Sequence, residues 1–187
     1  MSLFLAQGVE ATSAEQIAAD AGVTLRTFYR HFASKHELLF ADYDSGLQWF
    51  RGALAARPAG ERVVESVRAA IFAFPYDVEA ISQLAQLRAE ELDPERIVEH
   101  VRRVEADVAA AVAEHVERNL PEAERADPKR RFDAALTARC IAAALFAAME
   151  MWMEREQRSL ADLAELSRAA LTALEEGLQH DGLFRHY

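Results

Sequence analysis

The sequence predicts an all-α protein of about nine helices, in one or two domains. Its 187 residues are 51% hydrophobic and include only 7 Gly and 5 Pro, a composition that favours helices. No stretch alternates apolar and polar residues as a half-buried strand would, whereas apolar residues recur at helical spacing along most of the chain. A capping residue, or a proline at the first helical position, precedes several of these apolar stretches.

Two short helices joined by a tight turn are predicted near the N-terminus. Thr12 is the expected N-cap of the first, with Glu15 at the spacing of a capping box. Gly22 follows the apolar face of this helix, and glycine tolerates the left-handed conformation that ends a helix. Thr24 then caps a second helix that runs to about Phe32. The pattern indicates a helix-turn-helix.

The second of these helices has an outer face that suits DNA. Phe28 is its expected buried residue, and Val23 is the expected apolar plug between the two helices. The residues from Gly22 to His36 include three Lys or Arg and no Asp or Glu, a local charge of +3 in a chain of net charge −10. Because phosphate contacts supply much of the affinity for DNA, we interpret this local inversion of sign as a DNA-facing patch. The alternative is an ordinary helical hairpin with solvated charges.

The string Thr-Phe-Tyr-Arg-His-Phe-x-Ser-Lys-x-x-Leu-Leu, residues 27–39, resembles the N-terminal domain of the tetracycline-repressor (TetR) family of bacterial transcription regulators. The similarity is dense over about residues 3 to 47. It implies a helix-turn-helix DNA-binding domain at residues 1–46 and an effector-binding and dimerisation domain at residues 47–187. The family has a longer helix before the motif, so the first helix is expected to be short here.

The resemblance also implies which side chains contact double-stranded DNA. Thr12 and Ser13 would contact phosphate at the start of the first motif helix. The front of the second helix would meet base edges in the major groove, with Arg26 on guanine and Leu25 on a thymine methyl. Other phosphate contacts would come from the remaining outward residues. The full set of expected DNA contacts is Thr12, Ser13, Thr24, Leu25, Arg26, Thr27, Tyr29, Arg30, His31 and Lys35.

Six further helices are expected after the motif. A capping box of Ser34 and Glu37 would start the first of them, and proline at the first helical position marks two others. The expected ranges are 35–56, 64–74, 77–91, a helix from Pro94 to the polar loop at 119–127, 128–157, and a last helix capped by Ser159.

The last two long helices are apolar on wide faces, which suits a four-helix dimer interface. The first of the two carries Phe132, Leu136, Cys140, Ala143 and Phe146 on one side. A homodimer would place two recognition helices on a palindromic operator. The alternative is that both helices pack inside one subunit. Cys140, the single cysteine, excludes an intrachain disulfide and is expected to be a buried small residue in a cytosolic protein.

Aromatic and methionine side chains suit an apolar, adaptable effector cavity, although they also build ordinary helical cores. The resemblance implies a small-molecule effector, apolar or amphipathic, bound among the middle helices. Arg88 and Arg103 are expected either to bind an anionic group or to lie in solvent. The candidate pocket residues are Trp49, Phe50, Phe72, Tyr76, Leu84, Leu87, Phe146, Met149, Trp152 and Met153.

Other classes of protein are disfavoured by the sequence. The six histidines form no metal-binding pair, and no Gly-rich phosphate loop occurs, so we expect no enzyme, cofactor or metal site. No signal peptide is expected, and Arg139 and Glu150 interrupt the apolar residues 134–153, which argues against a membrane span. The prediction is a cytoplasmic repressor that a small-molecule effector releases from a palindromic operator. The alternative is a ligand-binding or protein-interaction helical dimer without DNA binding.

Overall fold

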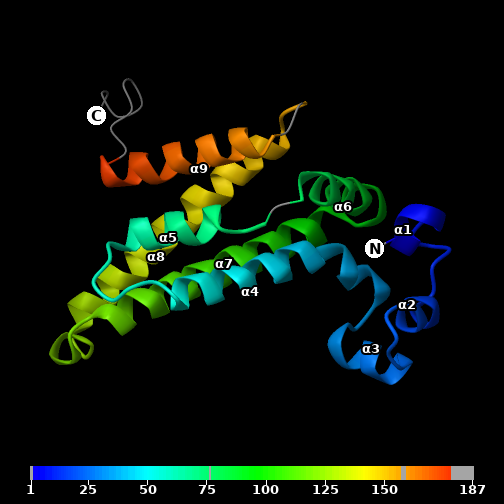
Figure 1. The fold of residues 1–187 in the computed structure, drawn as a ribbon, viewed down its shortest axis with the longest axis horizontal. Helices are drawn as coiled ribbons and strands as arrows, with labels where there is room; N and C mark the ends of the chain where they lie inside the picture. The colour runs from blue at the N-terminus through cyan, green and yellow to red at the C-terminus, as the bar shows by residue number, and fades with distance from the viewer. Residues whose placement is uncertain (1, 76, 157–158, 178–187) are drawn as a thin grey trace. The chain divides into compact units, whose positions relative to one another are not determined.

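A computed structural model describes residues 2–75, 77–156 and 159–177, which are helical with short connections. The described residues contain nine α-helices and two 3₁₀ helices, and no strand (Figure 1). This confirms the predicted all-α class. The helices are α1 (Ser2–Gln7), α2 (Ala14–Asp20), α3 (Leu25–His31), η1 (Lys35–Phe40), α4 (Ala41–Ala55), α5 (Val63–Phe72), α6 (Val78–Glu91), α7 (Pro94–Asn119), η2 (Glu122–Glu124), α8 (Pro128–Met153) and α9 (Leu160–Glu175).

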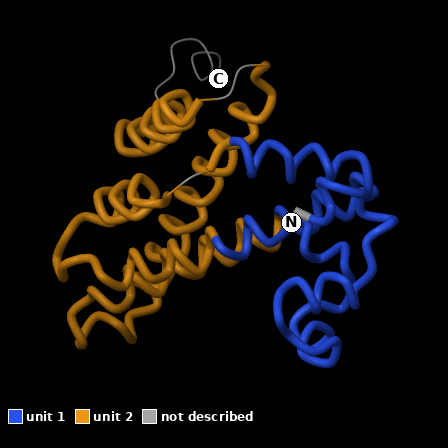
Figure 2. Tube along the Cα trace, turned by 45° about the vertical axis from the view of Figure 1, so that its right-hand side comes forward, with its two compact units in different colours: residues 1–45, 79–101 blue, residues 46–78, 102–187 orange. Residues whose placement is uncertain are grey.

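The chain divides into two compact units (Figure 2). The first unit comprises residues 1–45 and 79–101, and the second comprises residues 46–78 and 102–187. The chain first passes from one unit to the other within α4, after Ser45. This is one residue before the predicted domain boundary. The sequence pattern did not indicate that α6 and the first turns of α7 belong to the first unit. The effector and dimerisation roles of the later residues stay predictions.

Helix α2 begins one residue later than predicted, because Ser13 rather than Thr12 is its N-cap. The Gln16 amide donates to Ser13 Oγ at 3.2 Å, and the Ser13 amide donates to Gln16 Oε1 at 2.8 Å. This capping box satisfies two amides at the helix start. The Thr12 hydroxyl instead donates to the Gly8 carbonyl at 2.7 Å in a fully buried position. The prediction of a Thr12–Glu15 box was therefore wrong.

The turn after α2 is built as predicted around Gly22. Its φ of 66° lies in the left-handed region that glycine adopts without a Cβ penalty. The Val23 amide donates to the Ala18 carbonyl at 2.9 Å, and the Gly22 amide donates to the Ala19 carbonyl at 3.1 Å. These two bonds form a Schellman motif, which satisfies carbonyls at the end of α2. The chain can therefore enter α3 after only four residues.

The motif helices α2 and α3 pack through a small core. Ala14, Ala18 and Phe28 are its buried residues, and small alanines let the two helices approach closely. Phe28 lies where the sequence placed it. Val23 is 41% exposed, so the prediction that it plugs the space between the helices was wrong. Phe28 fills the interior between the two helices instead.

A larger core in the first unit brings α6 to the N-terminal helices. Its buried residues come from α1, the following turn, η1, the middle of α6 and the residue after α6, namely Phe4, Val9, Leu39, Phe40, Leu84 and Leu92. Because α6 supplies apolar surface that the helix-turn-helix lacks, it is part of the same hydrophobic unit.

A buried arginine adds a polar connection inside this unit. Arg88 of α6 is only 4% exposed, and its Nη1 donates to the Leu39 carbonyl at 2.7 Å and to Asp42 Oδ1 at 2.6 Å. The guanidinium carbon also lies 4.7 Å from the centre of the Tyr43 ring. Arg88 therefore neither lies in solvent nor lines an open anion site, the two roles expected for it.

The predicted long helix from Lys35 is two elements. Residues Lys35–Phe40 form the 3₁₀ helix η1, and α4 starts only at Ala41. Ser34 makes no side-chain capping bond; instead, Glu37 Oε2 accepts a hydrogen bond from the Ala33 amide at 2.7 Å. The expected Ser34–Glu37 capping box is therefore not formed, because Glu37 binds the amide of the residue before the N-cap.

The second unit contains most of α4 and α7, together with α5, α8 and α9. Helix α9 packs on α8 and on α5 (Figure 1). The predicted starts at Pro94, Pro128 and after Ser159 agree with the structure. Ser159 caps α9 as expected, because its hydroxyl accepts a hydrogen bond from the Asp162 amide at 3.1 Å. Asp127 also caps α8, by accepting a hydrogen bond from the Lys129 amide at 2.9 Å. Helix α8 ends at Met153, four residues earlier than predicted.

Helix α8 has two apolar faces. One face is buried and rich in small residues, with Ala134, Ala138, Ile141, Ala142, Phe146, Ala148 and Trp152. The opposite face, here called the α8 stripe, is exposed and consists of Phe132, Leu136, Cys140, Ala143, Ala147 and Met151. Cys140 is therefore exposed in this chain, not buried as predicted, because the alanine face alone meets the rest of the unit.

Helix α8 is also long and apolar enough to cross a membrane, judged by length and composition alone. One such helix is weak evidence for a membrane protein, because core helices of soluble proteins have the same properties.

Replacing Arg88 by Met should destabilise the first unit. The change leaves the Asp42 carboxylate and the Leu39 carbonyl without their shared donor, which costs about 3–5 kcal/mol for a broken buried pair. Urea unfolding followed by circular dichroism measures the loss in free energy of unfolding. Arg96→Met, at an exposed position of α7 in the same unit, is the control and should change stability by less than about 0.5 kcal/mol. Equal stability of the two variants would contradict the role given to Arg88.

Candidate nucleic-acid interface

The recognition-helix candidate α3 is held by its N-cap. The Thr27 amide donates to Thr24 Oγ1 at 3.1 Å, and the two threonine hydroxyls share a hydrogen bond at 2.9 Å. Thr24 is exposed and Thr27 is half-buried. Since the hydroxyl–hydroxyl bond fixes both side chains at the front of the helix, each threonine can still offer one further hydrogen bond outward.

The outward face of α3 consists of large polar side chains. Arg26, Tyr29, Arg30 and His31 are exposed, Tyr29 by 53%. The Tyr29 ring stands edge-on to the buried Phe28 at a centroid distance of 5.3 Å, so the core orients it. Arg30 Nη2 lies 3.3 Å from His31 Nε2. The two arginines are thus free to meet an anionic partner, in a segment without an acidic side chain.

Leu25 is more involved in the core than expected. It is half-buried and packs against the cluster of Ala14, Ala18 and Phe28. Only part of its side chain is therefore available for a thymine methyl. The signal was present in the sequence, because Leu25 lies three residues before Phe28 and so shares its side of the helix.

The two residues expected to contact phosphate at the start of α2 differ in exposure. Thr12 is fully buried, and its hydroxyl is bonded to Gly8, so it cannot reach phosphate as predicted. Ser13 is exposed, but its hydroxyl caps α2. Glu15 stands beside it, and hydrogen bonds from its own backbone amide and from Ser13 lower its pKa. This carboxylate therefore stays ionised and repels phosphate near the helix start.

Lys35, one of the expected phosphate contacts, has a structural position. Its ammonium group donates to the Val9 carbonyl at 2.8 Å and to the Glu10 carbonyl at 3.1 Å. The Glu10 carboxylate lies 3.7 Å away and also 3.3 Å from His36 Nε2. These contacts tie η1 to the turn after α1, and the predicted contact of Lys35 with phosphate stays a prediction. Sequence spacing could not reveal a partner 26 residues away.

The described candidates for the effector pocket do not gather around one cavity. Leu84 and Leu87 belong to the core of the first unit. In the second unit, the Trp152 indole donates to the Ser159 carbonyl at 2.9 Å, which gives this buried ring a structural role. Phe72 lines a cavity of ≈ 140 Å³ between α5 and α9. Trp49 is half-exposed, Phe50 and Phe146 are buried, Met149 and Met153 are half-buried, and Tyr76 lies outside the described residues.

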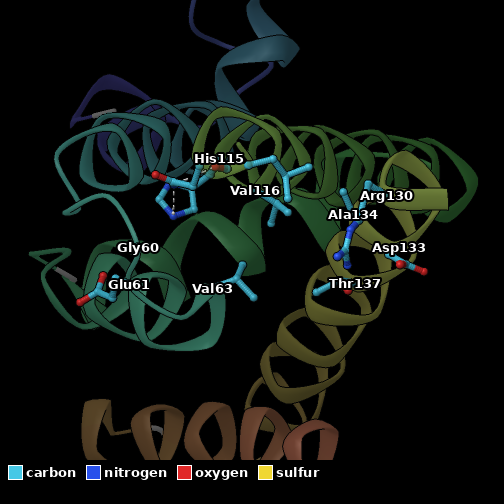
Figure 3. Close-up of a pocket in the computed structure, with 11 residues that line it drawn as sticks. Gly60, Glu61, Val63, His115, Val116, Arg130, Asp133, Ala134 and Thr137 are labelled. Carbon is cyan, nitrogen blue, oxygen red and sulfur yellow. Dashed lines mark hydrogen bonds between the residues drawn. The ribbon is translucent and has the colours of Figure 1, made fainter. Parts of the chain in front are cut away.

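A second cavity, of ≈ 330 Å³, contains none of the predicted residues (Figure 3). It lies in the second unit between the segment before α5, the last turns of α7 and the first turns of α8. His115 lines it and is 2% exposed. The sequence offered one signal, a histidine that continues the apolar stripe of α7. The partner segments come together only in the folded unit.

The geometry around α2 and α3 defines a helix-turn-helix protein with a basic recognition helix. Residues 1–41 match the family model described as bacterial regulatory proteins, tetR family. The N-terminal domain of this chain is therefore similar to the DNA-binding domain of the TetR family.

Two curated relatives are similar to part of this chain, and one solved structure can be set beside them. The HTH-type transcriptional regulator TcmR of Streptomyces glaucescens is 37% identical over 113 residues, which are 56% of this chain and 50% of that protein. The putative mycofactocin biosynthesis transcriptional regulator MftR of Mycobacterium tuberculosis is 32% identical over 74 residues, 40% of this chain and 37% of that protein. The chain thus spans half or less of these curated relatives. The crystal structure of the TetR family regulator PfmR from Thermus thermophilus has a TM-score of 0.41 and 21% identity, covering 96% of both chains.

Replacing Lys35 by Met should lower the stability of the free protein. The change removes two charge-assisted hydrogen bonds to backbone carbonyls, each worth about 1.5–3 kcal/mol at most when buried. Urea unfolding without DNA measures the change, with Lys129→Met, at an exposed position of α8, as the control. If Lys35→Met leaves stability unchanged and weakens DNA binding alone, Lys35 contacts phosphate and the structural assignment fails.

Proposed function

We propose that the protein is a DNA-binding transcription regulator that acts as a repressor on a palindromic operator. The observation that carries this proposal is the exposed, acid-free face of α3, with Arg26 and Arg30 directed away from the core. An α-helix with its side chains is about 10–12 Å across, and the major groove of DNA is about 12 Å wide. Helix α3 can therefore enter the groove.

The side chains of α3 divide into base-reading and phosphate-binding roles. Arg26 is in the first turn, where a recognition helix meets base edges, and its guanidinium suits the two acceptors of guanine. Tyr29, Arg30 and His31 lie further along the exposed face and suit phosphate oxygens. Since Thr12 and Lys35 are engaged inside the protein, this helix would supply a large share of the contacts.

We propose that the working form is a homodimer through α8 and α9. The α8 stripe supports this, because large contiguous apolar surfaces on soluble proteins commonly mark interaction sites. Phe132 is 64% exposed, an unfavourable position for an aromatic ring in water. A two-fold axis would bring the stripe against its copy and present two recognition helices to two half-sites about 34 Å apart.

An effector would act by favouring one of two states of the dimer. Its influence on DNA affinity equals its preference for one state over the other. Helix α4 supports such coupling, since it has residues in both compact units. We expect an apolar or amphipathic effector and a cytoplasmic protein without catalytic activity of its own.

Arg26→Ala should relax base preference. Duplexes enriched by the protein from a randomised pool would supply the operator, and fluorescence anisotropy would measure binding. We expect discrimination at one guanine to fall by about 5- to 150-fold, the value of a bidentate contact. Arg30→Ala should instead weaken binding to all duplexes alike and reduce the salt dependence by about one phosphate.

Arg51→Ala, at an exposed position of α4, is the control because it removes the same charge. It should change neither the base preference nor the salt dependence of binding. Failure of the folded dimer to enrich any duplex would reject the proposal. The chain would then act as a ligand-binding or protein-interaction dimer without DNA binding.

Leu136→Glu should dissociate the dimer, because it places a charge in the middle of the α8 stripe. Sedimentation equilibrium would detect the change in mass. Val98→Glu, a similarly exposed apolar position on α7, should leave the dimer intact. A dimer that tolerates Leu136→Glu would show that the interface lies elsewhere.

A further inference from the structure

The cavity of ≈ 330 Å³ in the second unit has the size of a small-molecule site. Ligand pockets in proteins commonly span about 300–1,000 Å³, so this one suits a small ligand. Its walls come from three segments of the chain (Figure 3). Val63 belongs to the first segment. His115 and Val116 belong to α7, and Leu120 follows it directly. Thr137 belongs to α8. A ligand here would contact all three segments at once.

Part of the cavity lining is apolar and uncharged. The valines, Leu120 and Ala134 form its apolar lining. His115 is buried beside them, and burial lowers its pKa, as does the positive charge of Arg118; a hydrogen bond to the Leu54 backbone partly offsets both effects. The imidazole is therefore neutral at pH 7. Such a wall favours an apolar group of the ligand.

The carboxylate of Glu61, on the segment before α5, is already paired with other residues of the protein. Glu61 accepts hydrogen bonds from Arg57 Nε at 2.7 Å and from Ser66 Oγ at 2.6 Å. These two bonds lower its pKa to about 2. The carboxylate is thus ionised and fully paired inside the protein, so it has little capacity left for a ligand.

Two side chains of opposite charge on α8 also line the cavity, and they do not pair with each other. Arg130 and Asp133 lie three residues apart on α8, and both line the cavity (Figure 3). Arg130 uses its Nε for Glu124 at 2.9 Å, which leaves its terminal nitrogens for other acceptors. Within the described part of the chain, Asp133 forms no ion pair. Side chains of opposite charge at this spacing ordinarily attract each other.

We propose that this cavity binds a small zwitterion with an apolar side chain, of the amino-acid type. Arg130 would bind the carboxylate of the ligand, Asp133 would bind its ammonium group, and the apolar side chain would lie between Val63, Val116 and Leu120. A guanidinium is well suited to a carboxylate because it can donate two parallel hydrogen bonds. The proposed function gives this binding a regulatory role, but binding itself does not require DNA.

Three probes that share one apolar group test the ligand class. Phenylalanine carries both charges, phenethylamine carries only the positive one, and hydrocinnamate carries only the negative one. Methyl NMR of the full chain reports the position of binding through Val63, Val116 and Leu120, with Val23 and Val98 of the first unit as controls. Titration of each probe gives the dissociation constant. We expect phenylalanine to bind at least about twofold more tightly than either analogue, the lower end for one added partly exposed ion pair.

Two variants assign the charges. Arg130→Gln should weaken the binding of phenylalanine and of hydrocinnamate by about two- to fivefold and leave the binding of phenethylamine unchanged. Asp133→Asn should weaken phenylalanine and phenethylamine and leave hydrocinnamate unchanged. Arg131→Gln, at the exposed neighbouring position, matches the first change outside the cavity and should affect none of the probes. Thermal unfolding of each variant verifies that the fold is retained.

Two results would overturn the proposal. One is that none of the probes shifts the Val63, Val116 and Leu120 methyl signals, which would show that the cavity takes no such ligand. The other is that a single-charge analogue binds as tightly as phenylalanine, which would exclude zwitterion recognition. Both measurements are made without DNA, so they stand apart from any failure of the protein to bind an operator.

Discussion

The buried guanidinium of Arg88 is the constraint on which the first unit depends. It joins α6 to the Leu39 carbonyl at the end of η1 and to the Asp42 carboxylate at the start of α4. Burying a charge is unfavourable unless it is paired and hydrogen-bonded, and here both conditions are met. The helix-turn-helix is therefore not an independent pair of short helices. It belongs to a unit that includes α6, whose apolar side chains complete the core around Phe4 and Phe40.

The basic segment around α3 serves two purposes with few charges. Lys35 is held by the carbonyls of Val9 and Glu10 and fixes the turn after α1. Arg26 and Arg30 remain exposed for a partner. In a chain of net charge −10, general attraction to DNA is weak, so affinity has to come from a small number of placed contacts. The rigid caps of α2 and α3 are consistent with this need, because they fix the side chains before binding.

Helix α8 connects three features of the second unit. Its alanine-rich face packs inside the unit, and its opposite face exposes the α8 stripe. Its first turns also line the cavity with Arg130, Asp133 and Thr137. A ligand at this end and a partner subunit along the stripe would therefore act on the same rigid element. This arrangement gives a physical route by which ligand and dimer geometry could be coupled.

The sequence by itself determined the helical class, the turn at Gly22 and the starts of α3, α7, α8 and α9. These features depend on contacts within a few residues, such as the Thr24 cap, and local chemistry is visible in the sequence. Its family resemblance also located the exposed arginines of α3. Only the tertiary structure decided that Ser13 and not Thr12 caps α2, that Arg88 is buried, and that Lys35 donates to backbone carbonyls. It also exposed Cys140 and assembled the cavity at His115. Arg88, Lys35 and the cavity depend on partners from distant parts of the chain, and the exposure of Cys140 depends on which face of an apolar helix meets the core. The cap at Ser13 follows from the burial of Thr12 in the folded unit. Local spacing encodes none of these outcomes.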